Sequence, residues 1–271
     1  MKKLIKIFLV LLLIYGCRHV KPDDGIGSNP PVFLKGISYD YCALNPSKDY
    51  KPFIDMLNSY NINMLRTFAY CGWSEDFFPW TGYMGNLKPE YVNRLKEFVS
   101  YANSKKIWVI LSLFQDNAGG GTENITSRDK GELATYILKI VEVIKDKGVI
   151  FEAINENPDS DFQSWVLSEL NKYGVRRSTY EVSLGADYDT HHTNDKNWTG
   201  QAGWSKYIHS TDTPKLIYLS DDDLIRISEQ AKEKGGHIEF LVFWGRDSQE
   251  LKTPQDITNE YGKVLEKLKG M

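Results

Sequence analysis

The chain has 271 residues with 41% hydrophobic residues, which is enough apolar sequence for one large folded domain. Its formal net charge of -3, its pI near 6.0 and the lack of a long basic run disfavour binding to nucleic acid.

Residues 1–17 predict a targeting segment, which takes no part in the fold. Lysines at 2, 3 and 6 precede an apolar stretch that is too short to span a bilayer. The run Leu-Ile-Tyr-Gly-Cys at 13–17 resembles a bacterial lipobox, in which the cysteine carries the lipid. We therefore expect Cys17 to anchor the protein in the bacterial cell envelope, on its periplasmic or its outer surface. The alternative is an ordinary secretory signal in which Cys17 is incidental.

Residues 18–31 are polar and rich in Gly, Pro and Asp, so we expect a flexible tether, followed by a folded domain at 32–271. Cys42 and Cys71 each follow a predicted strand in a compartment that permits disulfides. We expect them to form a disulfide, and two unpaired thiols are the alternative, because sequence does not supply the separation of their Cα atoms.

Short apolar runs alternate with amphipathic stretches of helical period, the pattern of a mostly parallel sheet with crossover helices. The predicted strands lie at 34–39, 63–68, 107–114, 149–154, 181–185, 206–209, 215–219 and 238–243. The predicted helices lie at 51–60, 89–104, 130–147, 162–173, 222–234 and 256–269. The segment 188–205 is poor in helix formers, so the fifth helix should be reduced or missing. The pattern predicts a single (β/α)8 TIM barrel, a fold of about 250 residues.

A doubly wound open sheet is the competing architecture. No glycine-rich dinucleotide fingerprint follows the first predicted strand, which disfavours it.

Asn155 and Glu156 end the fourth predicted strand, where such barrels place their chemistry. Breaking a glycosidic bond needs one carboxylic acid to protonate the leaving oxygen and a second carboxylate across the sugar. Glu156 is the candidate acid, and Asn155 can hydrogen-bond a sugar 2-hydroxyl. The alternative is that Asn-Glu-Asn-Pro is only a strand-to-helix turn with side-chain capping.

From about residue 35 to residue 269 the chain resembles the clan of retaining (β/α)8 glycoside hydrolases that includes the family 5 cellulases and mannanases. The resemblance implies that Glu156 is the general acid/base and that Arg66, at the end of strand two, supports the nucleophile. It also implies that His209 follows strand six and that Trp244, after strand eight, is a platform for the sugar.

The clan places its nucleophilic Glu after strand seven, where this chain has Ser220, Asp221, Asp222 and Asp223. We expect Asp221 to be the nucleophile or counter-base and Asp222 to be the reserve. An Asp is one methylene shorter, which leaves open retention, inversion or no hydrolysis. The alternative for the run is a helix N-cap with acidic residues favoured by the helix dipole.

Further residues fall in the predicted loops at the top of the barrel and are expected to line a sugar cleft. They are Tyr39, Asp40, Trp73, Trp80, Gln115, Asp116 and Asp187. Trp108 and Trp165 lie inside a strand and a helix and are expected in the core. His191 and His192 with Asp187 and Asp189 match no tight zinc spacing, so neither a metal nor a cofactor is expected.

The sequence thus predicts a lipid-anchored, monomeric glycoside hydrolase whose substrate is a β-linked polysaccharide or oligosaccharide. One alternative is a non-catalytic glycan-binding lipoprotein that kept the barrel and lost the second carboxylate. Another is a structural or protein-binding envelope lipoprotein, because exposed aromatic residues also bind proteins.

Overall fold

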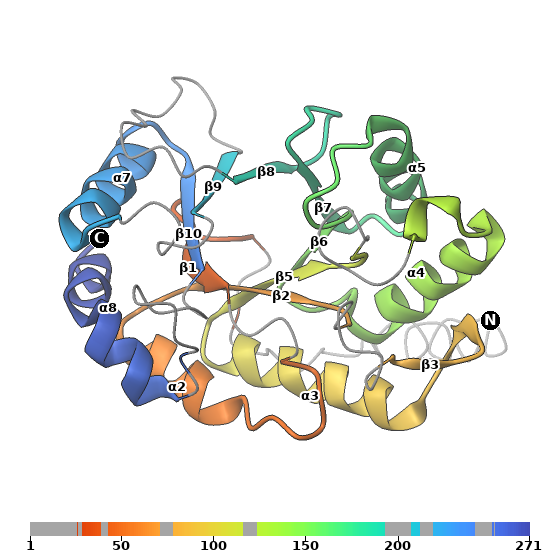
Figure 1. Cartoon of the computed structure of the whole chain (residues 1–271), viewed down its shortest axis with the longest axis horizontal. Helices are drawn as coiled ribbons and strands as arrows, with labels where there is room; N and C mark the ends of the chain where they lie inside the picture. The colour runs from red at the N-terminus through yellow and green to blue at the C-terminus, as the bar shows by residue number, and fades with distance from the viewer. Residues whose placement is uncertain are drawn as a thin grey trace, which may run out of the picture.

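A computed structural model describes residues 26, 29–38, 43–70, 78–115, 124–192, 207–211, 219–241, 251 and 253–271, with the backbone alone at 191–192, 207–211 and 241. Eight strands of this part of the chain close into a barrel in which every neighbouring pair is parallel (Figure 1). In chain order they are β1 (Lys35–Ser38), β2 (Met64–Phe68), β5 (Trp108–Ser112), β6 (Val149–Glu152), β7 (Arg176–Tyr180), β8 (Tyr188–His192), β9 (Tyr207–Thr211) and β10 (His237–Leu241). The predicted (β/α)8 barrel is confirmed.

The helices surround the barrel, with α2 and α3 along one side, α4 and α5 on the next, and α7 and α8 opposite these (Figure 1). They are α2 (Lys51–Ser59), α3 (Pro89–Ser104), the short 3-10 helix η3 (Ile125–Ser127), α4 (Lys130–Ile144), α5 (Ser160–Asn171), α7 (Asp221–Glu233) and α8 (Pro254–Lys269). The predicted helices match these bounds within three residues. None of the helices in the described ranges is long and apolar enough to cross a membrane.

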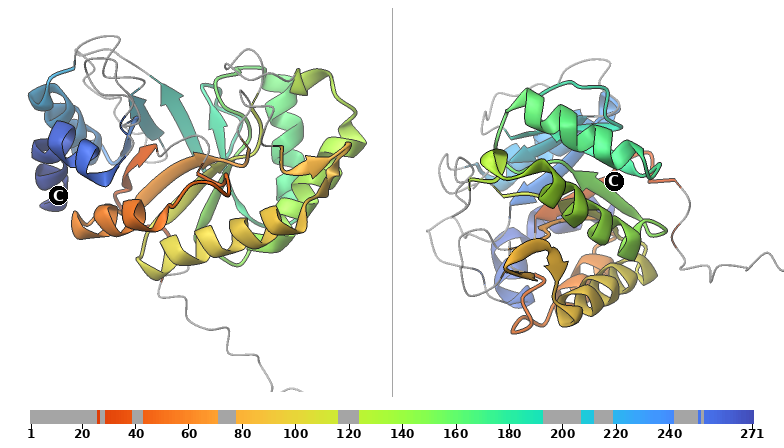
Figure 2. Two further views of the ribbon diagram at one scale, coloured as in Figure 1. Left: turned by 60° about the horizontal axis from the view of Figure 1, so that its bottom comes forward. Right: turned by 90° about the vertical axis from the view of Figure 1, so that its right-hand side faces the viewer.

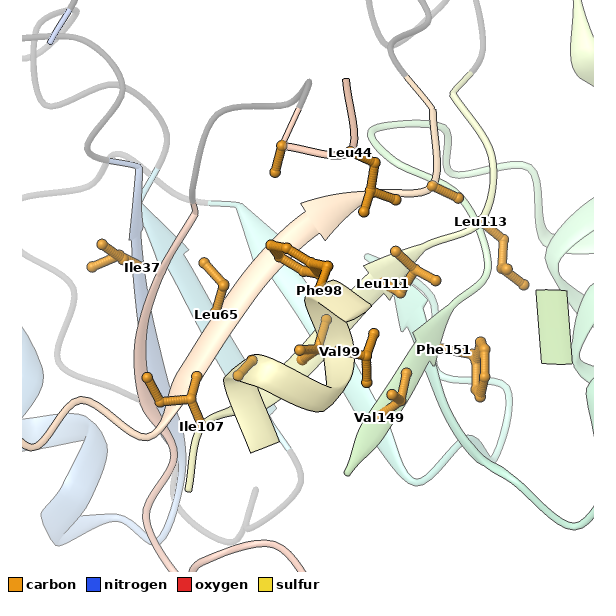
Figure 3. Close-up of a cluster of buried hydrophobic side chains, with 14 of the residues drawn as sticks. Ile37, Leu44, Leu65, Phe98, Val99, Ile107, Leu111, Leu113, Val149 and Phe151 are labelled. Carbon is orange, nitrogen blue, oxygen red and sulfur yellow. The ribbon is translucent and has the colours of Figure 1, made fainter. Parts of the chain in front are cut away.

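The strands alternate between an outer face packed on the helices and an inner face inside the barrel. In β6, Val149 and Phe151 face outward to the main hydrophobic cluster, whereas Ile150 belongs to a separate inner cluster. Figure 3 shows Phe98 and Val99 of α3 packed against the outward side chains of the neighbouring strands. The inner cluster is small and apolar, with Leu34, Met64, Trp108, Ile110 and Ile150. Trp108 is therefore a core residue, as expected.

Gly36 of β1 leaves no room for a side chain inside the barrel. A Cβ there would lie 2.6 Å from the carbonyl oxygen of Met64 and 2.8 Å from its Cβ. We expect Gly36→Ala to lower the free energy of unfolding by about 1–3 kcal/mol, because overpacked interiors shift backbone. Urea unfolding measures this loss in the free energy of unfolding. The control is Gly262→Ala in α8, which should not destabilise the protein, because an added Cβ meets nothing within 4 Å there and helix propensity favours alanine. Equal stability of Gly36→Ala and the wild type would contradict the expectation.

Three strands of the second half of the barrel lie elsewhere than predicted. Strand five is β7, and the predicted segment 181–185 belongs to the connection after it, where Glu181 and Gly185 have φ of 52° and 74°. Strand six is β8, which the sequence analysis assigned to a polar loop. The segment predicted as strand six overlaps β9, the seventh strand of the barrel. Of the predicted seventh strand at 215–219, only Leu219 is described, and it precedes α7.

The physical reason is that β7 and β8 are polar. Ser178 and Thr190 are both fully buried and bond each other through their hydroxyls at 2.9 Å across the two strands. A strand whose buried face carries hydroxyl side chains lacks the alternation of apolar and polar residues that identifies strands in a sequence. The connection from β7 to β8 spans only residues 181–187 and contains no helix. The expectation of a reduced or missing fifth helix is confirmed.

The amino-terminal end of the described chain packs against the amino ends of the strands, opposite the face on which such barrels place their active sites. Ile26 packs against the inner cluster and beside Gly148, which precedes β6. Asn29 accepts a hydrogen bond from Nη2 of Arg176, at the start of β7, at 2.8 Å. The last part of the predicted tether at 18–31 therefore contacts the barrel.

Candidate active site

Arg66 binds both Asn155 and a buried carboxylate, Glu152, that the sequence analysis did not single out. Arg66 donates from Nε to Oε2 of Glu152 and from Nη2 to Oε1 of Glu152, each at 2.7 Å. Nη2 of Arg66 also donates to Oδ1 of Asn155 at 2.7 Å. The side chains of Arg66 and Glu152 are 2% and 0% exposed. The guanidinium of β2 thus spans the barrel interior to the end of β6.

The electrostatics of this group are dominated by carboxylates. Burial lowers the pKa of Arg66, but the negative charges of Glu152, Glu239 and Glu156 more than offset it, so the pKa is raised. Glu239 of β10 is fully buried and accepts a hydrogen bond from Ser38, and its Oε2 has no hydrogen-bond partner in the described part of the chain. Arg66 is therefore fully charged and lies among acidic groups.

Glu152 and Glu239 carried a signal that sequence reasoning missed. Each is a charged residue inside a short apolar strand, in the runs Val-Ile-Phe-Glu and His-Ile-Glu-Phe-Leu. A glutamate is rarely fully buried unless it is paired. Their positions could therefore have indicated an interior ion pair with Arg66, the charged residue of β2.

Glu156 follows Asn155 in a left-handed backbone conformation with φ of 49°. This conformation costs a residue with a side chain about 1–2 kcal/mol, and such strain gathers at functional sites. Glu156 is partly exposed, in contrast to the buried Asn155 beside it. The charge of Glu156 contributes to the raised pKa of Arg66, so its carboxyl group belongs to the same group of charges at this end of the barrel.

Gln115 lies at the same end of the barrel. It forms an isolated parallel bridge with Asn155, and Asn155 donates its backbone N–H to the carbonyl oxygen of Phe114 at 3.0 Å. The hydroxyl of Tyr70, just after β2, donates to the backbone oxygen of Gln115 and accepts from its N–H, both at 3.0 Å. The chain segments after β2, β5 and β6 are thus locked together around Asn155.

Asp221 and Asp222 lie in the first turn of α7. The side chain of Asp222 is 83% exposed and pairs with Lys263 of α8 at 2.7 Å, and this hydrogen bond raises the pKa of Lys263. The charge of Asp221 adds to that increase. Ser220 and Asp223 form a capping box, as the N-cap alternative expected. Asp222 thus faces Lys263 of α8, and both aspartates lie at the start of α7.

The cap makes a stability prediction. The Ser220 hydroxyl accepts the backbone N–H of Asp223 at 3.1 Å, so Ser220→Ala should lower the free energy of unfolding by about 1 kcal/mol. Thermal unfolding followed by circular dichroism measures the loss. The exposed Ser104→Ala, at the end of α3, is the control and should change stability by less than about 0.5 kcal/mol. Equal effects of the two substitutions would argue against the cap.

His209 was expected after strand six, and this placement is wrong. It lies within β9, the seventh strand, in register with His191 of β8 and Ile238 of β10. The chain continues from β9 into Asp212. Asp212 is the first residue after β9 in the sequence and lies outside the described residues.

Two further expectations are corrected by burial and by position. Trp80 belongs to β3 (Trp80–Thr81), which pairs with β4 (Tyr83–Leu87) in a hairpin packed beside α4 (Figure 2). Its ring is 7% exposed and packs edge-on against Tyr70 and Tyr136, so it is a core residue and not a stacking surface. Asp187 precedes β8 and binds the backbone N–H of Arg177, the second residue of β7, which places it away from the carboxyl ends of the strands.

The other expected residues lie outside the described part of the chain. They are the lipidation candidate Cys17, the cysteines Cys42 and Cys71, and the cleft candidates Tyr39, Asp40, Trp73, Asp116 and Trp244. Trp165 of α5, expected in the core, is partly buried and has Lys130 over its ring.

The arrangement of Arg66, Asn155 and Glu156 on the first half of the barrel can be compared with known families. Residues 27–182 match the model of the cellulase family, glycosyl hydrolase family 5, over more than half of the chain. The chain belongs to family 5. The matched region holds Arg66, Asn155 and Glu156 and ends before β8. The expected glycoside hydrolase is thereby confirmed, whereas the half of the barrel that should supply the second carboxylate lies outside the match.

Solved structures of family 5 share the fold. A lichenase from Caldicellulosiruptor sp. F32 has a TM-score of 0.55 at 13% identity, covering 90% of this chain and 96% of its own. A family 5 protein from Bacteroides vulgatus has a TM-score of 0.61 at 12% identity, covering 87% of this chain and 64% of its own. The enzyme ZgEngAGH5_4, solved with a cellotriose, has a TM-score of 0.59 at 13% identity, covering 90% and 99%. No curated protein sequence matches the chain.

Proposed function

We propose that this family 5 hydrolase cleaves β-linked glucan chains or oligosaccharides, with Glu156 as the general acid/base. The observation that carries the proposal is the Glu156 carboxyl group in a strained turn beside Asn155, whose amide is fixed by Arg66. A partly exposed carboxyl group at the end of a barrel strand is where a leaving oxygen could be protonated. The cellotriose bound by the structural relative supports a gluco-oligosaccharide substrate.

The second carboxylate is to be found among the aspartates that follow β9. Asp212 comes first in the sequence, and Asp221 and Asp222 come later, at the cap of α7. Because Asp222 pairs with Lys263 on the outside of the helices, we expect Asp212→Asn to reduce hydrolysis far more than Asp222→Asn. The distance between the two catalytic carboxyl groups decides retention at about 5–5.5 Å or inversion at about 6.5–9.5 Å.

The experiment is release of reducing ends from a panel of cellulose derivatives, mixed-linkage β-glucan and β-mannan by the purified chain 18–271, which keeps the barrel contacts of Ile26 and Asn29. Hydrolysis of a β-glucan, lost in Asp212→Asn or Asp221→Asn, supports the proposal and identifies the second carboxylate. The anomer formed first, followed by NMR, distinguishes retention from inversion. Hydrolysis of none of these substrates would overturn the proposal.

A non-catalytic glycan-binding lipoprotein is the second candidate. The observation that favours it is the engagement of Asp222 with Lys263, together with the capping role of the Ser220–Asp223 run. This candidate predicts that calorimetry detects binding of cello-oligosaccharides while no hydrolysis occurs. It also predicts that Asp212→Asn leaves the binding affinity unchanged.

We also propose that the chain is a monomer held in the cell envelope by a lipid on Cys17. The lipobox-like run at 13–17 supports the anchor. In bacterial cells expressing the full chain, Cys17→Ala should move the protein from the membrane fraction to the soluble fraction and abolish labelling by a palmitate analogue. Unchanged labelling would contradict lipidation at Cys17, and light scattering of the purified chain 18–271 tests the monomer.

A further inference from the structure

Glu152 is connected through the side chain of Arg66 to Asn155, the residue that directly precedes the proposed acid/base. We propose that Glu152 is a positioning residue: it fixes the guanidinium of Arg66, which fixes the amide of Asn155 with its N–H donors toward the bound sugar. Glu152 itself is fully buried and does not touch the substrate. The inference rests on the proposed function of the same site and adds the residue that sets its geometry.

The first step is the orientation of Arg66. A guanidinium has a rigid planar fork of N–H donors, and Glu152 takes one edge of it, Nε and Nη2, with both of its oxygens. Two parallel hydrogen bonds fix the plane as well as the position of the group. The second N–H of Nη2 is then directed at Asn155, and Nη1 lies on the edge away from Glu152.

The second step is the orientation of Asn155. A side-chain amide has an accepting oxygen and a donating nitrogen that exchange places when it flips. Arg66 only donates, so the hydrogen bond from its Nη2 holds Oδ1 of Asn155 inward. Nδ2 therefore points away from Arg66, and it donates to no residue in the ranges that the structure describes. Asn155 is thus set as a donor beside Glu156.

The energetics agree with a geometric role. A buried ion pair contributes little net stability, because desolvation of both charges offsets their attraction, and apolar replacements are often as stable. Two apolar residues would fill the interior of this barrel as well. A bidentate pair of this kind adds a single fixed orientation, which matters where a displacement of about 1 Å lowers the rate roughly 10²-fold.

The test compares Glu152→Gln with a matched control, Glu239→Gln. Both remove one fully buried carboxylate whose charge acts on Arg66, but only Glu152 is hydrogen-bonded to it. We expect Glu152→Gln to lower kcat on the best β-glucan roughly 10- to 100-fold. Glu239→Gln leaves the hydrogen bonds of Arg66 in place and should therefore lower kcat less than Glu152→Gln does. Equal losses in the two variants, or no loss in Glu152→Gln, would overturn the proposal.

A second comparison separates positioning from general destabilisation. If Glu152 acts only through Arg66, then Glu152→Gln should cost no further activity in an Arg66→Met background. The same fold loss in both backgrounds would overturn the proposal. Should Glu152→Gln fail to fold, Glu152→Asp replaces it: this variant keeps the buried charge but is one methylene too short to hold both Nε and Nη2. A similar loss of kcat is expected, and wild-type kcat would count against the role.

A third readout does not depend on hydrolysis and separates this inference from the proposed function. In ¹⁵N-labelled protein the Nε–H of Arg66 should give a slowly exchanging NMR signal that disappears in Glu152→Gln and persists in Glu239→Gln. If wild type cleaves no glycan, the proposed function fails while this signal still tests the positioning. An unchanged Arg66 signal in Glu152→Gln would overturn the inference.

Discussion

Glu156→Gln is expected to lose hydrolysis by about 10²- to 10⁴-fold with its fold intact. The amide has nearly the shape of the carboxylic acid but has no proton to give to the leaving oxygen, and general acid catalysis contributes rate factors of this size. The left-handed backbone at residue 156, with φ of 49°, is unaffected by this substitution, so stability should match wild type. The measurement is initial reducing-end release, with thermal unfolding as the check on folding.

Glu181→Gln is a matched control for this variant. Glu181 also follows the end of a barrel strand, β7, and also has a left-handed backbone, with φ of 52°, but it is exposed and lies in the connection to β8. Its substitution should leave the rate unchanged. Full activity of Glu156→Gln, or an equal loss in Glu181→Gln, would refute the assignment of the acid/base.

Arg66→Met should lower the free energy of unfolding by about 3–5 kcal/mol. The substitution removes the positive charge that pairs with Glu152 in the described part of the chain and leaves that carboxylate buried without it, which is far costlier than removing both charges. Urea unfolding measures the loss. Adding Glu152→Gln to Arg66→Met should recover most of it, since a neutral amide is less costly to bury than a charge.

The control is an ion pair that water reaches. Arg128 pairs with Glu132 at 3.2 Å with 25% and 14% of the two side chains exposed, so Arg128→Met should cost no more than about 0.5 kcal/mol. If the double variant of Arg66 and Glu152 is as unstable as Arg66→Met alone, the unpaired charge is not the cause of the loss.

The first half of the barrel could be predicted from the sequence because its strands follow simple rules. The run ending at Ile154 is apolar and β-branched, and Asn155 and Glu156 stand where it stops. Arg66 can also be recognised from the sequence, because it is the charged residue within the mostly apolar run of β2. The left-handed conformation of Glu156 could not be predicted, because it depends on the tertiary contacts that hold Asn155 in place.

The second half could not be predicted for a physical reason that is visible in β7 and β8. Their inner faces carry Ser178 and Thr190. These buried hydroxyl groups hydrogen-bond each other, so the contact between the two strands here is polar and not apolar. Apolar periodicity therefore selected Val182 and Leu184 in the following connection instead. As a result, strand seven was predicted at 215–219 instead of at β9. The second carboxylate was therefore expected at Asp221, which is the first residue of a helix.

The contacts of Ile26 and Asn29 with the barrel determine which way a lipid-anchored molecule would face. Both residues bind at the amino-terminal ends of the strands, opposite the end that carries Asn155 and Glu156. Only eight residues separate Cys17 from Ile26, a reach of at most about 30 Å when fully extended. A lipid on Cys17 would therefore keep the amino-terminal end of the barrel close to the bilayer. The carboxyl-terminal end, which carries the candidate active site, would then face away from the membrane. Long polymers could then enter from the aqueous side without being threaded between enzyme and membrane.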